Sequence, residues 1–392
     1  MRVAGEGGLT PSAMTRRWEL DALRGLMLVL MTLTHLPTAV ANPLGQPLGH
    51  VSAAEGFVML SGYMAGMVYT LRARRDGVPE MREAFLRRAL KIYACQAALL
   101  VFLFTVVGFI DHFTDETAIG NLTSFFHQDP VAAVFGAALL LYNPPLLDIL
   151  PMYIVFMLAS PVLLMHGLHQ GWNGILLGSL LLWFASQFGF GGWLYELAVD
   201  LTDLPVPPEE TGSFAMFAWQ FLWVLGLWMG ATAATRPGHA PPFPRAMVVV
   251  AAVFAAVCFV WRHAVGQVPF GDHSPLNLLF DKWYLGPLRL LDFLALMILA
   301  MRFGPWLKQH LPRLRFLEVF GAASLTVFCV HLMLALVALA LVGESRPGRA
   351  PWIDPVVLGV SFAVLYGVAR VQQWFTARRP TAPRATPNSP PH

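Results

Sequence analysis

The sequence predicts an all-α membrane protein, a bundle of about ten transmembrane helices with one further short re-entrant or interfacial helix. Of the 392 residues, 56% are hydrophobic and only 12% are charged, about half the charged fraction of a typical soluble domain. The mean hydropathy is +0.59, and apolar runs recur along the whole chain with short polar breaks. No stretch alternates between apolar and polar residues at period two, which argues against a membrane barrel.

Ten apolar runs in the sequence approach or exceed the length of about 20 helical residues that crosses the hydrocarbon core. They lie at residues 21–40, 52–71, 89–110, 149–166, 174–192, 214–235, 246–262, 283–302, 318–342 and 353–374. A further run at 131–142 holds only twelve residues. We expect this run to re-enter the membrane or to lie along its outer surface, because it is too short to cross.

Basic residues occur in alternate breaks between the runs. This alternation sets the orientation, because short cytoplasmic loops retain Lys and Arg. The basic breaks contain Arg16, Arg17, Arg72, Arg74, Arg75, Arg82, Arg87, Arg88, Lys91, Arg236, Arg245, Arg302, Lys308, Arg313, Arg315, Arg378 and Arg379. The acidic breaks, which we place outside, contain Asp111, Asp115, Glu116, Asp200, Asp203, Glu209 and Glu210. Both termini are therefore predicted to be cytoplasmic.

The chain divides into one membrane domain and two tails. Residues 1–20 form a predicted cytoplasmic N-terminal tail, and residues 21–374 form the transmembrane domain. The stretch at 375–392 is rich in proline, a composition typical of disordered segments. We therefore expect a disordered cytoplasmic tail at the C-terminus.

The first apolar run, LDALRGLMLVLMTLTHLPTAV, contains Arg24 and His35 with ten residues between them. Eleven helical residues rotate by about three turns plus 20° and rise by about 16 Å, so the two side chains share one face at different depths. Ionisable groups inside a membrane span are costly and by default mark a functional path. Arg24, near the inner end, fits either a site that attracts an anionic donor or an interfacial arginine that extends to lipid headgroups.

Glu55 lies near the start of the second run, which a short loop joins to the first. This topology places Glu55 at the depth of His35. A carboxylate that accepts from one imidazole nitrogen fixes the tautomer and raises the basicity of the other nitrogen, as a general base requires. We therefore predict a catalytic pair of His35 and Glu55. The alternative is a pair that only satisfies its own charges in a low dielectric.

Other polar side chains fall in the outer third of their runs and are predicted to line an outward-facing cavity that binds the acceptor or the acyl group. They are Trp219, Gln220, Asp281, Lys282, Arg289 and Asp292. Aromatic and amide groups beside charges suit a sugar, although Trp219 and Trp283 also fit the aromatic belt at a membrane interface.

Three further features bear on packing or on a possible site. His331 lies near the middle of the ninth run, two turns after Ser324, and fits a ligand contact or a hydrogen bond between helices. Ser61, Gly62 and Gly66 fit close helix packing. The cysteines, Cys95, Cys258 and Cys329, stand singly in apolar runs, and no spacing of Cys and His suggests a metal site.

Six ordered blocks resemble a known family. ELDALRGLMLVLMTLTHLP resembles the signature of the membrane acyltransferase-3 superfamily, whose members have ten core spans and move acyl groups from cytoplasmic donors to extracytoplasmic acceptors. The blocks AAEGFVMLSGYMAG, ILPMYIVFMLASPVLL, FAWQFLWVLGLW, DKWYLGPLRLLDFLAL and GAASLTVFCVHL are similar to successive blocks of the osmoregulated periplasmic glucan biosynthesis protein C family, the glucan succinyltransferases. The resemblance covers about residues 16–342.

The resemblance implies an O-succinyltransferase of the bacterial inner membrane. Its cosubstrate would be an acyl-CoA, namely succinyl-CoA, with no permanently bound cofactor and no metal. Its partners would be the acyl-CoA donor, a periplasmic glucan acceptor and the lipid bilayer, and not nucleic acid. His35 would be the catalytic histidine, Arg24 its partner in the motif, and Glu55 the acidic position before the FVxLSG block. Asp281, Arg289 and His331 match family-typical positions without an assigned role.

In the mechanism that fits both lines of reasoning, His35 takes a proton from a glucan hydroxyl, which attacks the thioester of the donor. An acyl-histidine intermediate is an open alternative. The segments 111–130 and 193–212 match nothing in the family, so an acetyl or other acyl group, or another envelope polysaccharide, is also open. The third alternative is a proton-coupled transporter, against which stand the missing internal repeat and the absence of matched broken helices.

Overall fold

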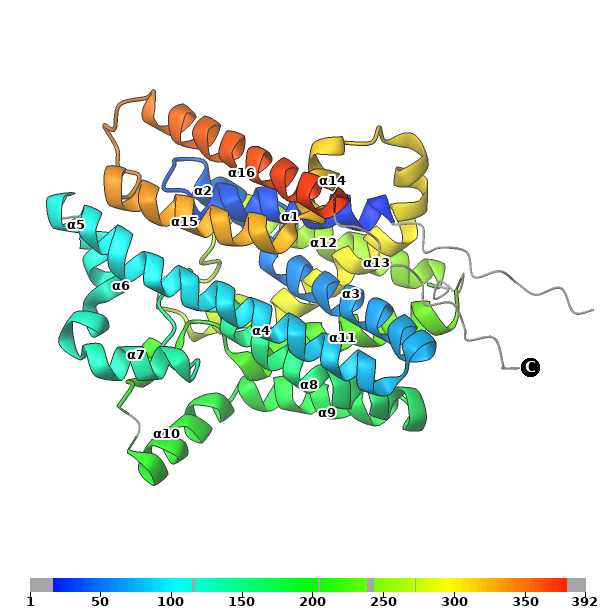
Figure 1. Cartoon of the computed structure of the whole chain (residues 1–392). Coiled ribbons are helices and arrows are strands. Elements are labelled where there is room, and N and C mark those ends of the chain that lie inside the picture. The colour runs from blue at the N-terminus through cyan, green and yellow to red at the C-terminus, as the bar shows by residue number, and fades with distance from the viewer. Residues whose placement is uncertain (1–16, 115–116, 204, 238–242, 272, 379–392) are drawn as a thin grey trace, which may run out of the picture.

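The computed structural model describes residues 17–114, 117–203, 205–237, 243–271 and 273–378. Every regular element within these ranges is a helix (Figure 1). The predicted all-α class is therefore confirmed.

The helices form one bundle in which most long helices run roughly side by side (Figure 1). The α-helices are α1 (Trp18–His35), α2 (Ala41–Leu44), α3 (Ala53–Asp76), α4 (Val78–Phe102), α5 (Gly108–Thr114), α6 (Thr117–Gln128), α7 (Pro130–Ala138), α8 (Ile149–Gln170), α9 (Asn173–Ser186), α10 (Phe190–Thr202), α11 (Met216–Thr235), α12 (Arg245–Val265), α13 (Pro287–His310), α14 (Arg315–Ala322), α15 (Ser324–Val342) and α16 (Ile353–Ala377). One π-helical turn, η1 (Leu103–Val107), joins α4 to α5, and two 3₁₀ turns are η2 (Pro208–Thr211) and η3 (Pro275–Phe280).

Seven helical segments in the described part of the chain are long and apolar enough to cross a membrane, or eight if the bent pair α9 and α10 forms one span. The protein is therefore a multi-pass membrane protein. The predicted spans 21–40 and 52–71 correspond to α1 and α3. These two helices are not among the seven segments, because their polar and charged side chains make them less apolar. The count of ten spans stays a prediction.

Helix α1 ends at His35, five residues before the end of the predicted span 21–40. Leu36 adopts an extended conformation with φ −70° and ψ 135°. The residue before a proline is sterically biased away from the helical region, and Pro37 follows Leu36. His35 therefore lies at the very end of the helix rather than inside it.

Two of the predicted spans are broken. The span 174–192 is divided into α9 and α10, whose axes differ by 79°, and Gly189 before α10 has a φ of 81° that favours glycine. The span 318–342 is divided at Ala323 into α14 and α15. The described residues contain one such strongly bent pair, whereas inverted-repeat carriers typically have a matched second one.

The short run at 131–142 forms helix α7, which spans only Pro130–Ala138. At nine residues it is far too short to cross the hydrocarbon, in agreement with the prediction. Its predicted position on the outer side stays a prediction. The third span is longer than predicted, because a helical segment of 33 residues extends from Val78 to Ile110.

The tails differ slightly from the predicted boundaries. Helix α1 begins at Trp18 and α16 continues to Ala377, so residues 18–20 and 375–377 are helical. The rest of the predicted disordered tail, from 379 onward, lies outside the described residues, as do residues 1–16.

Glycines allow α3 and α11 to approach each other closely. A Cβ atom at Gly62 or Gly66 of α3 would overlap a backbone carbonyl of α11, and one at Gly226 or Gly230 of α11 would overlap a carbonyl of α3. Small residues allow such contact between membrane helices, where van der Waals packing replaces the hydrophobic effect. The predicted packing role of the Gly62 and Gly66 segment is confirmed.

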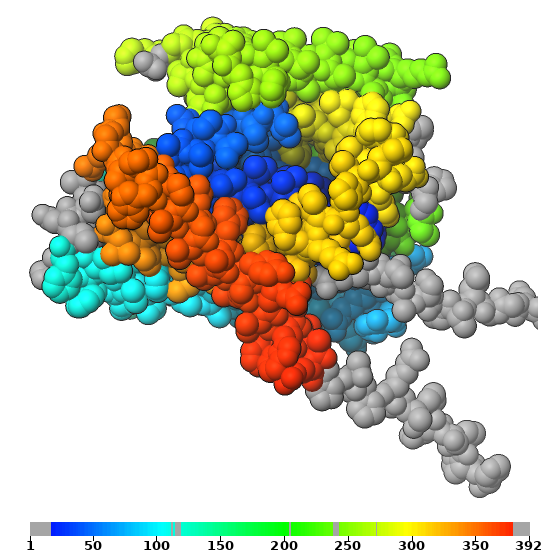
Figure 2. All heavy atoms as spheres, turned by 90° about the horizontal axis from the view of Figure 1, so that it is seen from above, coloured from blue at the N-terminus to red at the C-terminus, as the bar shows by residue number. Residues whose placement is uncertain are grey.

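Helix α1 packs closely against α14 and also contacts α3 and α15. A Cβ atom at Gly25 would overlap the backbone of α14, and one at Gly321 of α14 would overlap the backbone of α1. Figure 2 shows the dark blue atoms of α1 between the orange-red atoms of α15 and α16 and the yellow atoms of α13. The helix that carries Arg24 and His35 is thus flanked by the C-terminal helices, while Leu23 and Leu26 on it stay exposed.

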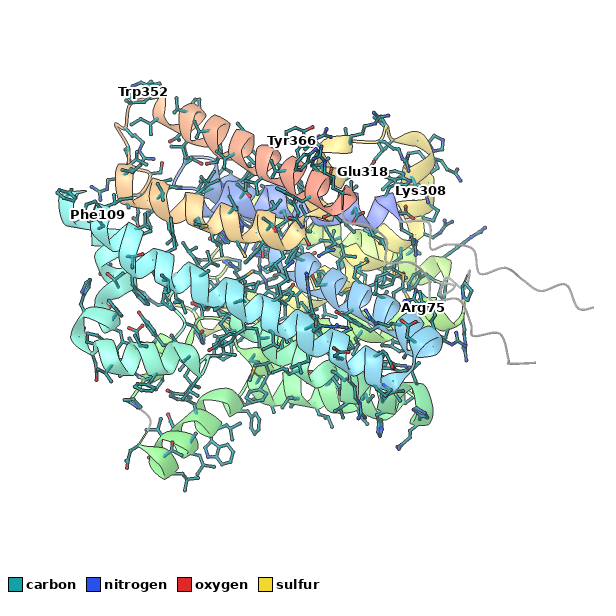
Figure 3. All side chains as sticks on the ribbon, viewed as in Figure 1. Arg75, Phe109, Lys308, Glu318, Trp352 and Tyr366 are labelled. Atoms are coloured by element: carbon teal, nitrogen blue, oxygen red, sulfur yellow. The ribbon has the colours of Figure 1, made fainter. Side chains whose placement is uncertain are left out.

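The two ends of the bundle differ in chemistry. Arg75 and Lys308 lie at one end, which we call the basic end, and Phe109 and Trp352 lie at the opposite end (Figure 3). The predicted cytoplasmic breaks contain both Arg75 and Lys308. The fold therefore gathers at one end the residues that the alternation of charge assigned to one side.

Replacing Gly66 with leucine is expected to destabilise the protein by about 3 kcal/mol or more, since a large side chain would have to displace backbone atoms of α11. Thermal unfolding of the purified protein in detergent measures the effect. Gly359→Leu on α16, where an added Cβ meets nothing within 4 Å, is the matched control. Equal melting temperatures for the two variants would contradict the close α3–α11 contact.

Candidate active site

The candidate site centres on two histidines that come together from opposite parts of the chain. His35 Nδ1, at the end of α1, lies 3.0 Å from His331 Nε2 on α15, a hydrogen-bonding distance. The two rings stack with centroids 5.2 Å apart and planes 15° from parallel. His331 has no exposed surface, whereas His35 is only partly buried. Of the two predictions for His331, the contact between helices is the one that the structure contains.

Glu55 does not pair with His35, so the predicted His35–Glu55 hydrogen bond was wrong. Oε1 of Glu55 accepts from Arg289 Nε at 2.5 Å, and Oε2 accepts from the backbone N–H of Ser52 at 3.0 Å and from its hydroxyl at 2.6 Å. The Ser52 and Glu55 contacts form a capping box at the start of α3. The S-x-x-E pattern is readable in the sequence and could have indicated that Glu55 serves its own helix.

Arg289 belongs to the same buried ion pair. Its side chain is 1% exposed and that of Glu55 is 0% exposed, so the guanidinium of Arg289 is not open to a succinyl carboxylate. The acyl-binding role of Arg289 stays a prediction, and the burial of the pair weighs against it. Charges buried this deeply need a partner, because an unpaired ion in low dielectric is very costly.

The loop that connects His35 to α3 is fixed to α13 as well. Asp292 Oδ2, one turn after Arg289 on α13, accepts from the backbone N–H of His50 at 2.9 Å. Gly49 has a φ of +120°, and a Cβ there would overlap the Asp292 carboxylate. Asp292, predicted to line an outward cavity, is instead fully buried and anchors this loop.

The residues directly after His35 are held by the loop between α15 and α16. Arg349 Nη1 donates to the carbonyl of Pro37 at 2.5 Å, and Asp354 Oδ2 accepts from the backbone N–H of Ala39 at 2.8 Å. Arg349 also donates to Asp354 Oδ1 at 3.4 Å. The sequence analysis missed Arg349 and Asp354. Arg349 is 312 residues away from Pro37 in the chain, and a contact between such distant residues leaves no local sequence pattern.

Arg24 points into the bundle. Its Nη2 donates to the hydroxyl of Ser324 at the start of α15, so the interpretation as a lipid-facing arginine was wrong. Ser324 and His331 are seven residues apart, about two helical turns, and share a face of α15. The predicted shared face of Arg24 and His35 is confirmed, because both residues contact this face of α15.

Trp219 and Gln220 are used within the protein scaffold. Trp219 has no exposed surface, and its Nε1 donates to the carbonyl of Trp283 at 3.0 Å. Gln220 donates to the carbonyl of Ser179 at 2.7 Å and accepts from the Ser179 hydroxyl at 2.6 Å. Both residues were predicted to line an acceptor cavity. Because Trp219 is fully buried, it neither lines a cavity nor belongs to the aromatic belt at the membrane interface. Trp283, 38% exposed, still fits the belt.

Asp281 and Lys282 lie in the loop before α13. Asp281 Oδ1 accepts from the backbone N–H of Tyr284 at 2.7 Å and so closes the turn. The Lys282 ammonium lies 4.5 Å from the centroid of the Trp283 ring and close enough to His35 to interact with it electrostatically. Burial lowers the pKa of the Lys282 ammonium from its ordinary value. Lys282 is thus a predicted acyl- or acceptor-binding residue that lies near the histidine.

A cavity of about 260 Å³ lies next to the histidine pair. Arg24 and Ser324 form part of its wall, as does Phe328. The ring of Phe328 contacts the ring of His331 edge-on, with centroids 4.9 Å apart. The cavity and the histidine pair are therefore separated by one aromatic side chain.

The described ranges contain no group of three or more His, Cys, Asp or Glu side chains that could hold a metal ion. The groups near the histidine pair include the two imidazoles and the Lys282 ammonium. Such groups can transfer protons and orient a substrate.

The fold and the site define a multi-pass helical membrane protein with a pair of contacting histidines in its bundle. The chain belongs to the OpgC family, whose model, described as OpgC protein, matches residues 16–377. The family resemblance found in the sequence is thereby confirmed over nearly the whole chain. Membership implies a membrane transferase of acyl groups for periplasmic glucans. The wider acyltransferase-3 relationship stays a prediction.

Comparison with curated proteins found no match, and comparison with solved structures found none either. The roles of individual residues are therefore argued from the geometry of this chain.

Replacing Arg289 with leucine is expected to destabilise the protein by about 3–5 kcal/mol, because it leaves the buried Glu55 carboxylate without its partner. The double variant Glu55→Gln with Arg289→Leu should recover part of this loss, since Gln can keep the capping box. Thermal unfolding in detergent compares both with Arg87→Leu, which removes an exposed ion pair with Glu83 and should change little. Similar small losses for all three would contradict the structural importance of the buried pair.

Proposed function

We propose that this protein moves a succinyl group from cytoplasmic succinyl-CoA to hydroxyl groups of osmoregulated periplasmic glucans at the bacterial inner membrane. Family membership supports a transferase for periplasmic glucans. The observation that carries the proposal for the site is the 3.0 Å contact between His35 and His331. It joins one partly exposed imidazole, which can meet a substrate, to one fully buried imidazole, which can orient it.

The orientation of the rings supports His35 as the general base. Two neutral imidazoles at this distance share one N–H, and we assign it to Nδ1 of His35. His331 Nε2 then accepts the hydrogen bond, and His35 Nδ1–H donates it. This tautomer leaves the Nε2 lone pair of His35 free to take a proton. His331 thus takes over the positioning role that the sequence analysis gave to Glu55.

The proposed reaction is a direct acyl transfer. The glucan hydroxyl gives its proton to His35 Nε2 and attacks the carbonyl carbon of the thioester, so that a new C–O bond forms. The tetrahedral intermediate then breaks its C–S bond. The leaving thiolate takes the proton back from the imidazolium of His35, which restores the free base. An attack by His35 itself, through an acyl-histidine, uses the same geometry.

Lys282 is our candidate for recognition of the acyl group. A succinyl group ends in a free carboxylate, which needs a cationic partner when it leaves water. Arg289 is taken by Glu55, whereas the Lys282 ammonium is half-buried near His35 and makes cation–π contacts with Trp283 and Phe214. An acetyl group has no such carboxylate, so this lysine bears on the choice between the two acyl groups.

Two observations weigh against a proton-coupled transporter. Glu55 and Arg289, which were expected to line its path, are locked in a buried pair. The described residues include one strongly bent helix pair, whereas an inverted-repeat carrier has a matching one in each half.

His35→Ala is expected to lower glucan acylation by roughly 10²–10⁴-fold, the usual contribution of a general base, with normal membrane insertion. His331→Ala should lower kcat less, and His331→Gln should restore part of it while shifting the pH profile of kcat. The assay is acyl transfer by purified protein, with the exposed His169→Ala as control. Full activity in the His35→Ala variant would refute the assignment.

Deleting the protein from its host should remove succinyl groups from the periplasmic glucans, and restoring it should return them. Mass spectrometry of the extracted glucans gives the answer, because each substituent adds one succinyl mass. A loss of acetyl mass instead would identify the alternative acyl group. Glucans that are unchanged by deletion would contradict the proposed acceptor.

A further inference from the structure

The cavity beside the histidine pair is elongated along α3. Its wall contains residues of this helix from Phe57 to Tyr69, twelve residues that correspond to about 18 Å of helix. Helices α4, α8, α11 and α15 complete the wall, and α1 contributes Arg24. At about 260 Å³ the space is close to the lower limit of small-molecule pockets. It therefore suits a thin chain better than a compact, bulky ligand.

The two ends of this cavity differ. Tyr69 and Arg88 line the end that lies toward Arg75 at the C-terminus of α3, hence toward the basic end. Phe57, Tyr153 and Phe328 line the other end, and the ring of Phe57 contacts the rings of the other two. The cavity thus leads from a cationic entrance to an aromatic wall one ring away from His331.

Arg88 has the properties of an anion-binding residue. Its side chain is half-buried in the cavity wall, and within the described residues no hydrogen bond or ion pair occupies its guanidinium. Its neighbour Arg87 is instead exposed, is not part of the cavity wall, and pairs with Glu83 at 3.2 Å. None of the cavity-lining residues is acidic. A guanidinium without a carboxylate partner at the mouth of an apolar space is suited to a phosphate.

We propose that this cavity binds the phosphopantetheine arm of the thioester donor, with Arg88 on the phosphate. The arm then passes Arg24 and Ser324 in the middle of the cavity, and the acyl end reaches Phe328 beside the histidine pair. The nucleotide part of the donor is too large for the cavity and stays outside at the basic end. The choice of a thioester donor rests on the proposed function; the phosphate site at Arg88 rests on geometry and charge.

A phospholipid is the competing occupant, since it also joins a phosphate to a thin apolar chain. The polar groups of Arg24 and Ser324 in the wall favour the amide-containing arm over a hydrocarbon tail, because a tail cannot hydrogen-bond to them. The position of the closed end next to His331 also fits a reactive group better than the end of a lipid tail.

The test is equilibrium binding of three probes to the purified full chain in nanodiscs: coenzyme A, 4′-phosphopantetheine and pantetheine. The unmodified protein should bind 4′-phosphopantetheine roughly tenfold or more tightly than pantetheine, as expected for a charge-assisted contact. Arg88→Gln should remove this preference, and Arg88→Lys should keep part of it. Arg87→Gln, on the adjacent residue, is the matched control and should keep all of it.

A second variant tests the path of the arm. Ala65 is buried in the cavity wall, so Ala65→Phe should fill the cavity and abolish binding of all three probes. Ala256→Phe, at an exposed position of α12, should leave binding unchanged. Size-exclusion chromatography shows which variants fold. Unchanged probe binding in Arg88→Gln and in a folded Ala65→Phe would overturn the proposal. Native mass spectrometry provides a second way to overturn it. This would be a co-purified phospholipid that Ala65→Phe expels without any change in coenzyme A binding.

The outcome is separable from that of the proposed function. Coenzyme A binding that depends on Arg88 without any acylation of glucans would support the donor site and contradict the proposed reaction. Normal glucan acylation with an unchanged donor KM in Arg88→Gln would contradict the donor site and leave the reaction standing.

Discussion

The buried ion pair of Glu55 and Arg289 is the constraint on which the site geometry depends. Neither side chain reaches water, so each charge is tolerable only while the other is in place. The pair joins the start of α3 to the start of α13, and Asp292 on α13 holds the connecting loop through the backbone of His50. The loop between His35 and α3 is thereby held against α13 through His50, and the start of α3 is held against α13 through the ion pair.

The position of His35 follows from this constraint and from three local ones. Pro37 ends the helix just after the histidine, Arg349 holds the carbonyl of Pro37, and His331 meets the ring itself. His35 at the end of α1 has a partly exposed ring. The backbone is fixed before it by the helix and after it by the contact of Arg349 with Pro37. A general base needs both conditions, because it must touch its substrate in a fixed orientation.

The polar groups around the histidines are divided between two sides of the bundle. The cavity with Arg24 and Arg88 lies toward the basic end, whereas Lys282 lies in the loop before α13, which is at the opposite end of that helix from Lys308. Phe328 separates the cavity from His331. Such an arrangement suits a transferase whose two substrates approach from different sides, since the donor and acceptor need to meet only at the histidine.

The sequence by itself determined what depends on local periodicity and hydropathy: the helical class, the shared face of Arg24 and His35, and the close packing at Gly62 and Gly66. The capping box of Ser52 and Glu55 was also readable, because it lies within one turn. Only the tertiary structure decided the partners. It paired Glu55 with Arg289, 234 residues away, placed His331 in contact with His35, and buried Trp219. Burial makes each polar group take whichever partner the packing of distant helices supplies, and no local pattern records that choice.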